Sequence, residues 1–472
     1  MEDMQMCKRF LTILLAVLIL TAVISPAFSA SALLFEKPEL ALSSQHALVI
    51  NLNTGTEVYD LRADEQLYPA STTKIMTAIL TLEACGDLEE KVEVTKTAMS
   101  HIDIYSSQAG LLAGESLSVR ELLGLLMVKS ARDAACVLAE RVSGSEEAFA
   151  ELMNQKASEL GCTGTHFVNS TGMHDDDHYS TARDIAIITQ YALKNPDFVE
   201  FFAMKQVETA ATELSGKRFF STTNYLIDAN RGGKHYYKYA TGGKTGTTTP
   251  AGRCLVSTAK KGEDEYLCLV FGADGDNSRN INKAFSDTAA LYNWCFENIA
   301  LKKVGASNGA QFETKLRYAW DHDYITLTVK NDAYAVMPSS ADTELKYDDG
   351  TPGLTGLLVS VDIPDHLDAP VEAGDPAGTA TYFYRDADGD TVLAKADIVV
   401  YESIDRNFFS FIFTNIGSFF SSTPMIIIII VLIVGLVLFL IIRGITRSKS
   451  HRNYRYRGSK KYQSYTRNRR RY

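Results

Sequence analysis

A long, uncharged apolar run near the C-terminus, Met425 to Ile442, most limits what this chain can become. A helix of these eighteen residues, at about 1.5 Å each, would be about 27 Å long, close to the hydrocarbon thickness of a bilayer. Five consecutive isoleucines, Ile426 to Ile430, leave no polar face of the kind a water-soluble helix shows. We therefore predict a single transmembrane helix over 425–442.

The N-terminus carries a second, shorter apolar run. Lys8 and Arg9 precede apolar residues 11–24, and small residues follow, including Ala30 and Ala32. A positive region, a short hydrophobic region and an A-x-A site are typical of a secretory signal peptide. An uncleaved anchor helix is the alternative, but the short run and the small residues favour cleavage. We predict a signal peptide over 1–32.

The segment after the C-terminal run, residues 443–472, has twelve Lys or Arg and no Asp or Glu. Positively charged flanks of membrane helices stay in the cytoplasm. We therefore predict a single-pass protein of the cell membrane, with a basic cytoplasmic tail and its main body on the extracytoplasmic side. Tyr alternates with Arg in the tail, but topology and contact with anionic lipids explain this composition. No nucleic-acid partner is predicted.

Cysteine usage argues against a disulfide-built fold. One of the seven cysteines, Cys7, lies in the signal peptide, and the other six are sparse and form no C-x-x-C pair. Such spacing does not match a small disulfide scaffold. We predict buried free thiols, with a bridge between Cys254 and Cys268 as the alternative if their strands pair.

The pattern over residues 33–298 predicts a mixed α/β domain. Two apolar-rich runs over 46–60 flank a turn at Asn53 to Gly55, which indicates a hairpin. Helical spacing follows Ser71, and a capping box at Ser118 to Glu121 starts a further run of helices. Strand patterns return after residue 239, and a last helix is expected over 285–298. This order indicates an antiparallel sheet flanked by helices.

Beyond this domain the pattern changes twice. Residues 301–402 contain short alternating segments punctuated by Gly and Asp, which predict a separate all-β domain. The segment 405–422 is rich in Phe and suits the membrane interface.

A serine and a lysine stand three residues apart at an expected helix start. In Ser71-Thr72-Thr73-Lys74 the first and last residues share a helix face, with Cβ atoms about 5–6 Å apart. A lysine made neutral by burial or by nearby cations can deprotonate such a serine. The S-x-x-K spacing alone is common, so it carries little weight without other motifs.

Two further motifs follow in the order that the same chemistry needs. Ser130 lies in a connection between two predicted helices, where its hydroxyl can pass a proton to a leaving amine. Lys244-Thr245-Gly246 lies on a predicted strand and supplies a cation, a hydroxyl donor and a close backbone approach. Together, in this order and these settings, the motifs are much more specific than any one of them.

With these motifs the chain resembles the serine-type D-alanyl-D-alanine carboxypeptidases, the low-molecular-mass penicillin-binding proteins. The resemblance covers roughly residues 44–400 and includes the stretches YPASTTKIMTA, THFVNSTGMHDDDHYSTARDIA, STTNYL and GGKTGTTTPAGRCLVSTA. It implies a β-lactamase/transpeptidase-like α/β catalytic domain. It also implies two partners, a peptidoglycan stem peptide ending in D-Ala-D-Ala and β-lactam antibiotics, with no cofactor and no metal.

The resemblance also implies a role for each motif residue. Ser71 would be the acylated nucleophile, Lys74 its general base and Ser130 the proton relay. The substrate carboxylate would face Lys244 and Thr245. Backbone N–H groups of Ser71 and Thr247 would form the oxyanion hole that such chemistry needs. Gly246, the residue before Thr247, would allow the strand to approach the substrate closely.

One position departs from the family pattern. The third residue of the middle motif is usually Asn, and here it is Arg132. An Asn amide both donates and accepts hydrogen bonds, whereas Arg only donates and is always charged. A cation there either lowers the Lys74 pKa further or crowds the cleft and repels Lys244. Arg279 is a second candidate substrate-binding residue, by a possible match to a family arginine, with a solvated loop residue as the alternative.

Other functions stay open beside this one. The chain could be a catalytically impaired or inert wall-binding relative because of Arg132, or a DD-endopeptidase or β-lactamase on the same scaffold. The absence of an E-x-x-L-N segment favours a carboxypeptidase over a class A β-lactamase. A metal hydrolase using His174 and His178 is a further alternative, although these residues fall in an expected acidic loop. A G-x-S-x-G match at 305–309 lies in a polar linker, which does not fit a nucleophile elbow.

Overall fold

The computed structural model describes residues 38–100, 102, 106–276, 281–307, 309, 311–342, 344–386, 389–409, 411 and 426–443. The predicted signal peptide, most of the Phe-rich segment, nearly all of the basic tail and Arg279 lie outside these residues. Internal contacts divide the chain into two compact units. The first comprises Met1–Ala306, Asn331–Ser360 and Ala380–Ala396, and the second Ser307–Lys330, Val361–Thr379 and Asp397–Tyr472.

A five-stranded antiparallel sheet forms the centre of the first unit. Its order is β2-β1-β9-β8-β7, with β1 (His46–Asn51), β2 (Glu57–Leu61), β7 (Ala240–Thr248), β8 (Gly252–Lys261) and β9 (Asp264–Ala273). The predicted β1–β2 hairpin is confirmed, and Gly55 in its turn has a φ of +76°, which glycine adopts readily. The sheet thus places the first strand of the chain, β1, between β2 and the later strand β9.

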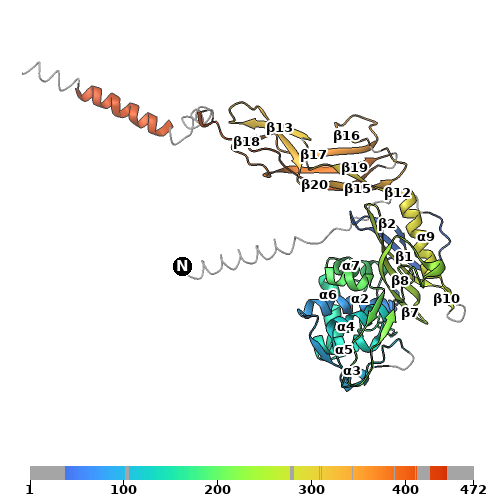
Figure 1. The fold of residues 1–472 in the computed structure, drawn as a ribbon. Coiled ribbons are helices and arrows are strands. Elements are labelled where there is room, and N and C mark those ends of the chain that lie inside the picture. The colour runs from blue at the N-terminus through green and yellow to red at the C-terminus, as the bar shows by residue number, and fades with distance from the viewer. Residues whose placement is uncertain are drawn as a thin grey trace, which may run out of the picture. The chain divides into compact units, whose positions relative to one another are not determined.

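Helices cover both faces of this sheet (Figure 1). The bounds are η1 (Ala70–Thr73), α2 (Lys74–Ala84), α3 (Lys96–Ser100), α4 (Val119–Gly124), η2 (Leu125–Lys129), α5 (Arg132–Ser143), α6 (Glu146–Glu159), α7 (Ala182–Ala192), α8 (Pro196–Ala203), η3 (Gly233–His235) and α9 (Lys283–Asn298). Strand β1 shows why both faces are covered. Leu48 and Ile50 belong to the core beneath α2 and its neighbours, whereas Ala47 and Val49 belong to the core beneath α9. Side chains alternate across a strand, so a continuous apolar run buries both faces.

The described residues before α9 also contain three short strand pairs. They are β3 (Lys91–Glu93) with β4 (Ser116–Ser118), β5 (Gln206–Glu208) with β6 (Phe219–Ser221), and β10 (Gly275–Asp276) with β11 (Ile281–Asn282). The predicted capping box at the start of α4 is confirmed. Ser118 Oγ accepts from the Glu121 N–H at 3.1 Å, and a Glu121 carboxylate oxygen accepts from the Ser118 N–H at 2.8 Å.

The cysteine prediction is also settled by strand register. All six described cysteines are buried free thiols. Strands β8 and β9 do pair, but Cys268 stands opposite Ser257, and Cys254 falls at an irregularity between Arg253 and Leu255. The two thiols are therefore not cross-strand neighbours, and the alternative bridge is wrong. Complete burial raises the pKa of the Cys254 thiol to about 12.

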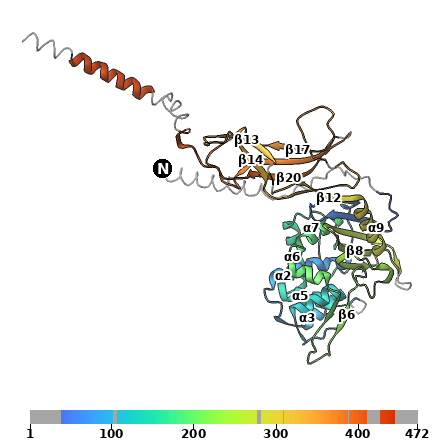
Figure 2. The same ribbon diagram turned by 45° about the horizontal axis from the view of Figure 1, so that its top comes forward.

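Strands are the only regular secondary structure among the described residues from 299 to 400, as Figures 1 and 2 show. This confirms the all-β expectation. Strand β12 (Ile299–Gly305) pairs with β15 (Ala333–Pro338). A seven-stranded sheet has the order β16-β17-β19-β20-β14-β13-β18. Its strands are β13 (Phe312–Arg317), β14 (Tyr324–Val329), β16 (Lys346–Tyr347), β17 (Gly356–Asp362), β18 (His366–Asp368), β19 (Pro376–Arg385) and β20 (Asp390–Val400).

The predicted C-terminal apolar segment is helical. Among the described residues, one helix, Ile426–Arg443, is long and apolar enough to cross a membrane, with a mean hydropathy of 3.4. The limits of the predicted domains and the sidedness of this helix remain predictions.

Candidate active site

The S-x-x-K residues lie where a tight turn becomes a helix. Ala70, with a φ of +48°, opens the 3-10 turn η1, and α2 continues from Lys74. Lys74 Nζ lies 3.1 Å from Ser71 Oγ, the distance that proton transfer between the two groups requires. The same ammonium nitrogen also contacts the Thr171 carbonyl. The sequence spacing therefore does bring the two side chains together.

Lys74 is buried, and burial is the main reason that its pKa falls to about 7. The positive charge of Arg132 lowers it further, while Cys136, Glu146 and Asp133 act in the opposite direction. Near neutral pH, about half of the amine is then uncharged and free to accept a proton. An exposed lysine would be almost wholly protonated under the same conditions.

Ser130 and Lys244 form the other side of the site. Helix η2 ends at Ser130, which adopts a left-handed conformation with a φ of +61°. Lys244 Nζ, on β7, donates to Ser130 Oγ and to the Thr245 carbonyl, each at 2.8 Å. Lys244 is wholly buried, and burial together with the charge of Lys74 holds its pKa well below the usual lysine value. The middle and last motifs are thus joined directly.

Strand β7 passes close to Ser71 because Gly246 has no side chain. A Cβ on Gly246 would lie 3.1 Å from the Ser71 backbone nitrogen and 3.2 Å from the Pro69 carbonyl oxygen. One residue before it, Thr245 Oγ1 shares a 2.6 Å hydrogen bond with Thr223 Oγ1. The backbone of β7 therefore runs beside the turn that carries Ser71.

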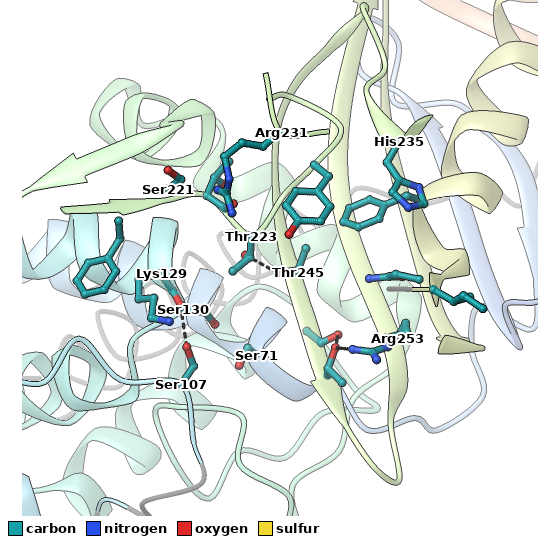
Figure 3. A pocket seen from close by; sticks show the side chains of 18 of the residues that line it. Ser71, Ser107, Lys129, Ser130, Ser221, Thr223, Arg231, His235, Thr245 and Arg253 are labelled. Carbon is teal, nitrogen blue, oxygen red and sulfur yellow. Dashed lines mark hydrogen bonds between the residues drawn. The ribbon is translucent and has the colours of Figure 1, made fainter. Parts of the chain in front are cut away.

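These groups open into a cleft of about 640 Å³ (Figure 3). Of the predicted site residues, Ser71, Ser130 and residues 245–247 line it. Sequence reasoning missed further lining residues that the fold brings in from other segments: Ser107, Lys129, Thr223, Tyr225, Arg231, His235 and Arg253. The STTNYL stretch was noticed as a family resemblance, but nothing in its residue types assigned a role to Thr223 or Tyr225. For Arg231 and Arg253, the sequence carried no distinguishing signal.

Two groups of lining residues lie on opposite sides of Ser71. Lys129 and Ser107 stand beside Ser130, and Ser107 Oγ donates to the Lys129 carbonyl at 2.9 Å. At the other end, Arg253 lies opposite Thr247 in the β7–β8 pairing, and Arg253 Nη1 is 3.3 Å from Thr247 Oγ1. Figure 3 shows this arginine on the far side of Ser71 from Ser107.

Arg132 is the first residue of helix α5. Its N–H donates to the Ser107 carbonyl at 2.8 Å, and its Nε and Nη1 atoms are buried without a hydrogen-bond partner in the described part of the chain. Arg132 is not among the described residues that line the cleft. The structure supports one influence of Arg132 on the site: its positive charge lowers the pKa of Lys74.

The Thr171 carbonyl that holds Lys74 belongs to a tightly built segment. Asn169 Oδ1 accepts from the N–H groups of Thr171, Gly172 and Met173 at 2.8–3.1 Å. Glu146 Oε1 accepts from both the N–H and the hydroxyl of Ser170, at 2.7 and 2.8 Å. The segment is thereby attached to helix α6 and fixes the position of the carbonyl.

Gly172 shows how closely this segment packs on the turn that carries Ser71. Its φ is +73°, and a Cβ there would lie 1.8 Å from the Ala70 carbonyl oxygen. A side chain is therefore excluded both by the backbone conformation and by the lack of space.

The histidine pair considered as a metal site is used differently. His178 is buried, and its Nδ1 accepts from the Val168 N–H at 3.1 Å. Its Nε2 must then carry the hydrogen and donate to Thr73 Oγ1 at 2.9 Å. Burial lowers the pKa of His178 to about 4. Both ring nitrogens are occupied, so His178 supports the turn after Ser71 and has no lone pair left for a metal shared with His174.

Comparisons with known proteins identify the family of the chain. Residues 33–275 match peptidase family S11, described as D-alanyl-D-alanine carboxypeptidase. The D-alanyl-D-alanine carboxypeptidase DacF of Bacillus subtilis is 32% identical over 87% of this chain and 98% of its own length. DacA of Escherichia coli is 27% identical over 78% of this chain and 85% of its own length.

Solved structures show the same fold. Penicillin-binding protein 5 of Haemophilus influenzae superposes with a TM-score of 0.62 at 23% identity, over 79% of this chain and all of that chain. PBP3 of Streptococcus pneumoniae, described as a peptidoglycan synthesis regulatory factor, has a TM-score of 0.62 at 24% identity over 78% of this chain and all of that chain. The chain therefore belongs to peptidase family S11, the D-alanyl-D-alanine carboxypeptidases.

Proposed function

We propose that this carboxypeptidase is a serine enzyme that removes the terminal D-alanine from peptidoglycan stem pentapeptides through an acyl-enzyme on Ser71. One observation carries the proposal: the buried Lys74 amine, with a pKa of about 7, lies 3.1 Å from Ser71 Oγ, and Ser71 lines the cleft. A neutral amine at this distance can take the hydroxyl proton as the oxygen attacks.

Acylation begins when Ser71 Oγ attacks the carbonyl carbon between the two D-alanines and Lys74 takes its proton. Negative charge then develops on the carbonyl oxygen. The N–H groups of Ser71 and Thr247 are the proposed donors to it, because Gly246 lets β7 approach the nucleophile turn. Fixed donors of this kind stabilise the tetrahedral intermediate without reorganising during the reaction.

Breakdown of the intermediate releases D-alanine on the Ser130 side. The Ser130 hydroxyl accepts a hydrogen bond from Lys244 and keeps its own hydrogen available for the departing nitrogen. Ser130 gives its hydroxyl proton to the departing nitrogen and takes up the proton that Lys74 received from Ser71. The C–N bond breaks as the amine is protonated. Water then attacks the acyl-enzyme, Lys74 again removes a proton, and Ser71 is regenerated.

The position of Ser130 also places the substrate in the cleft. The leaving D-alanine lies on the Ser130 side, so its carboxylate falls near Lys244 and Thr245, with Arg231 and Lys129 adding positive charge along that wall. A bound carboxylate favours the protonated form of Lys244 and raises its depressed pKa. The acyl half of the peptide then extends past Thr247. Arg279 and the side chain of Arg132 have no assigned step in this scheme.

Two accompanying proposals concern inhibitors and location. β-Lactams present a strained amide to the same nucleophile, so they are expected to acylate Ser71. The helix Ile426–Arg443 is proposed to span the cell membrane once, with the catalytic part outside and residues 444–472 in the cytoplasm, because the positive flank stays inside. The substrate and the enzyme then occupy the same compartment.

The test uses the purified full-length chain with fluorescent penicillin and with a peptide ending in D-Ala-D-Ala. Ser71→Ala is the active-site variant, and Ser286→Ala on the exposed side of α9 is the matched control. We expect labelling and D-alanine release from the wild type and from Ser286→Ala, and neither from Ser71→Ala. Labelling without D-alanine release would refute carboxypeptidase action on that peptide. Neither signal from a folded wild-type chain would favour an inert wall-binding relative.

The remaining alternatives are separated by substrate and inhibitor. Cleavage of a cross-linked muropeptide dimer faster than of the pentapeptide would identify a DD-endopeptidase. Rapid turnover of penicillin would identify a β-lactamase. EDTA should leave D-alanine release unchanged, because both ring nitrogens of His178 are already occupied.

A further inference from the structure

Exposed aromatic rings gather in the second unit, where the loop between β13 and β14 meets the segment after β20. Trp320, Phe408 and Phe409 are 62%, 62% and 61% exposed. Their rings contact one another, with centroids 6.3 Å apart both for Trp320 and Phe409 and for Phe408 and Phe409. We call these three residues the aromatic patch. Adjoining exposed apolar rings of this size are unusual on a water-exposed surface and indicate a partner.

The backbone beneath the patch is held by specific bonds. Tyr318 has a φ of +65°, which is uncommon for a residue with a side chain, and its carbonyl accepts from the Asn407 N–H at 2.5 Å. The Phe411 N–H donates to the Asn407 carbonyl at 3.0 Å. The Tyr318 and Phe411 rings lie 5.3 Å apart. The loop and the following segment are therefore joined, and the patch is presented by a defined structure.

An arginine joins the segment after β20 to the residue that follows β18. Arg406 Nε donates to the Ala369 carbonyl at 2.6 Å, and its guanidinium lies 4.5 Å from the centre of the Phe411 ring. The neighbouring loop also carries Asp321 and Asp323, so charge alone does not draw this surface to an anionic partner. The contact that the surface offers is mainly the insertion of rings.

The chain itself indicates what covers the patch. Ile426, the first residue of the helix that can span a membrane, follows Phe411 by fifteen residues. That length reaches at most about 54 Å when fully extended and about 22 Å as a helix. The patch is therefore tethered within that reach of the bilayer surface. Trp is enriched at this level of a bilayer, and Trp and Phe form the apolar face of segments that lie in the interface.

We propose that Trp320, Phe408 and Phe409 insert into the interfacial layer of the bilayer that the C-terminal helix spans. The second unit then has two membrane contacts, one by the helix and one by the patch, which limits its rotation about the tether. This contact does not depend on the catalytic chemistry of the first unit.

The two tryptophans of the chain allow a direct test. Trp294→Phe leaves Trp320 as the only tryptophan, and Trp320→Phe leaves Trp294, which packs on Tyr59 in the first unit. Each full-length variant is reconstituted into phosphatidylcholine–phosphatidylglycerol vesicles whose acyl chains are brominated either near the headgroup or near the chain end. We expect Trp320 emission to be blue-shifted and quenched most strongly by bromine near the headgroup, and Trp294 emission to be unaffected.

A second pair of variants tests the patch as a unit. Replacing both Phe408 and Phe409 by Ser in the Trp294→Phe chain should reduce quenching of Trp320 severalfold, whereas Tyr347→Ser, an exposed aromatic elsewhere in the sheet, should not. Trp320 emission typical of water and unquenched by either lipid would overturn the proposal. Blue-shifted emission that depends on protein concentration, without bromine quenching, would instead assign the patch to a contact between two copies of the chain.

Discussion

The pH dependence of acylation tests whether Lys74 is the base. With a pKa of about 7, half of the Lys74 amine is neutral at pH 7 and about 1% at pH 5, whereas an ordinary lysine near 10.5 would be about 0.03% neutral at pH 7. The second-order rate of labelling by fluorescent penicillin should therefore fall about tenfold per pH unit below 7 and level off above about pH 8. Lys74→Arg, which is always charged, should lower the plateau by about 10²–10⁴-fold.

Arg132 provides the direction of a further shift. Its charge lowers the Lys74 pKa, so Arg132→Gln should move the acid limb of the labelling profile to higher pH. Arg141→Gln, on the same helix but exposed and paired with Glu90, is the matched control and should leave the midpoint unchanged. A rate that is flat from pH 5 to pH 9, or that rises continuously to about pH 10, would refute the assignment of Lys74 as a base that is neutral near pH 7. A downward shift in Arg132→Gln would refute the electrostatic role of Arg132.

Three further outcomes follow from the same structure. The folded state lowers the pKa of Lys74, so the unfolded chain binds more protons between about pH 7 and pH 10.5, and stability rises with pH in that range. Lys74→Met should therefore raise the free energy of unfolding at pH 7 by up to about 5 kcal/mol. Urea titrations should show that this gain shrinks toward pH 10. Gly172→Ala should lower the melting temperature by at least about 5 °C and abolish labelling, because its Cβ would collide with the Ala70 carbonyl; an unchanged melting temperature would show that the turn can relax. Glu146→Ala removes the acceptor that holds the Ser170 segment, so it should slow labelling by about 10-fold on the plateau above about pH 8, where loss of the Glu146 charge no longer changes the neutral fraction of Lys74. The exposed Glu151→Ala on the same helix should not slow it, and equal rates would show that Glu146 has no positioning role.

Local patterns in the sequence were sufficient for several elements. The β1–β2 turn, the capping box at Ser118 and Glu121 and the apolar C-terminal helix all depend on residues close together in the chain. The S-x-x-K spacing also placed Ser71 beside Lys74, because three residues nearly complete one helical turn. The S-x-x-K, Ser130 and K-T-G motifs, with their order and settings, were enough to recognise the family.

Other features depend on contacts between distant segments, so only the tertiary structure decided them. The Thr171 carbonyl meets Lys74 across 97 positions, and Lys244 meets Ser130 across 114. Neither the burial that lowers the pKa of Lys74 nor the exclusion of Arg132 from the cleft lining can be read from residue types, because both depend on how helices pack on the sheet. The sequence by itself determined which chemical groups are present and which local elements carry them. The fold decided which groups meet, because solvent exclusion and close contact arise only when remote segments pack together.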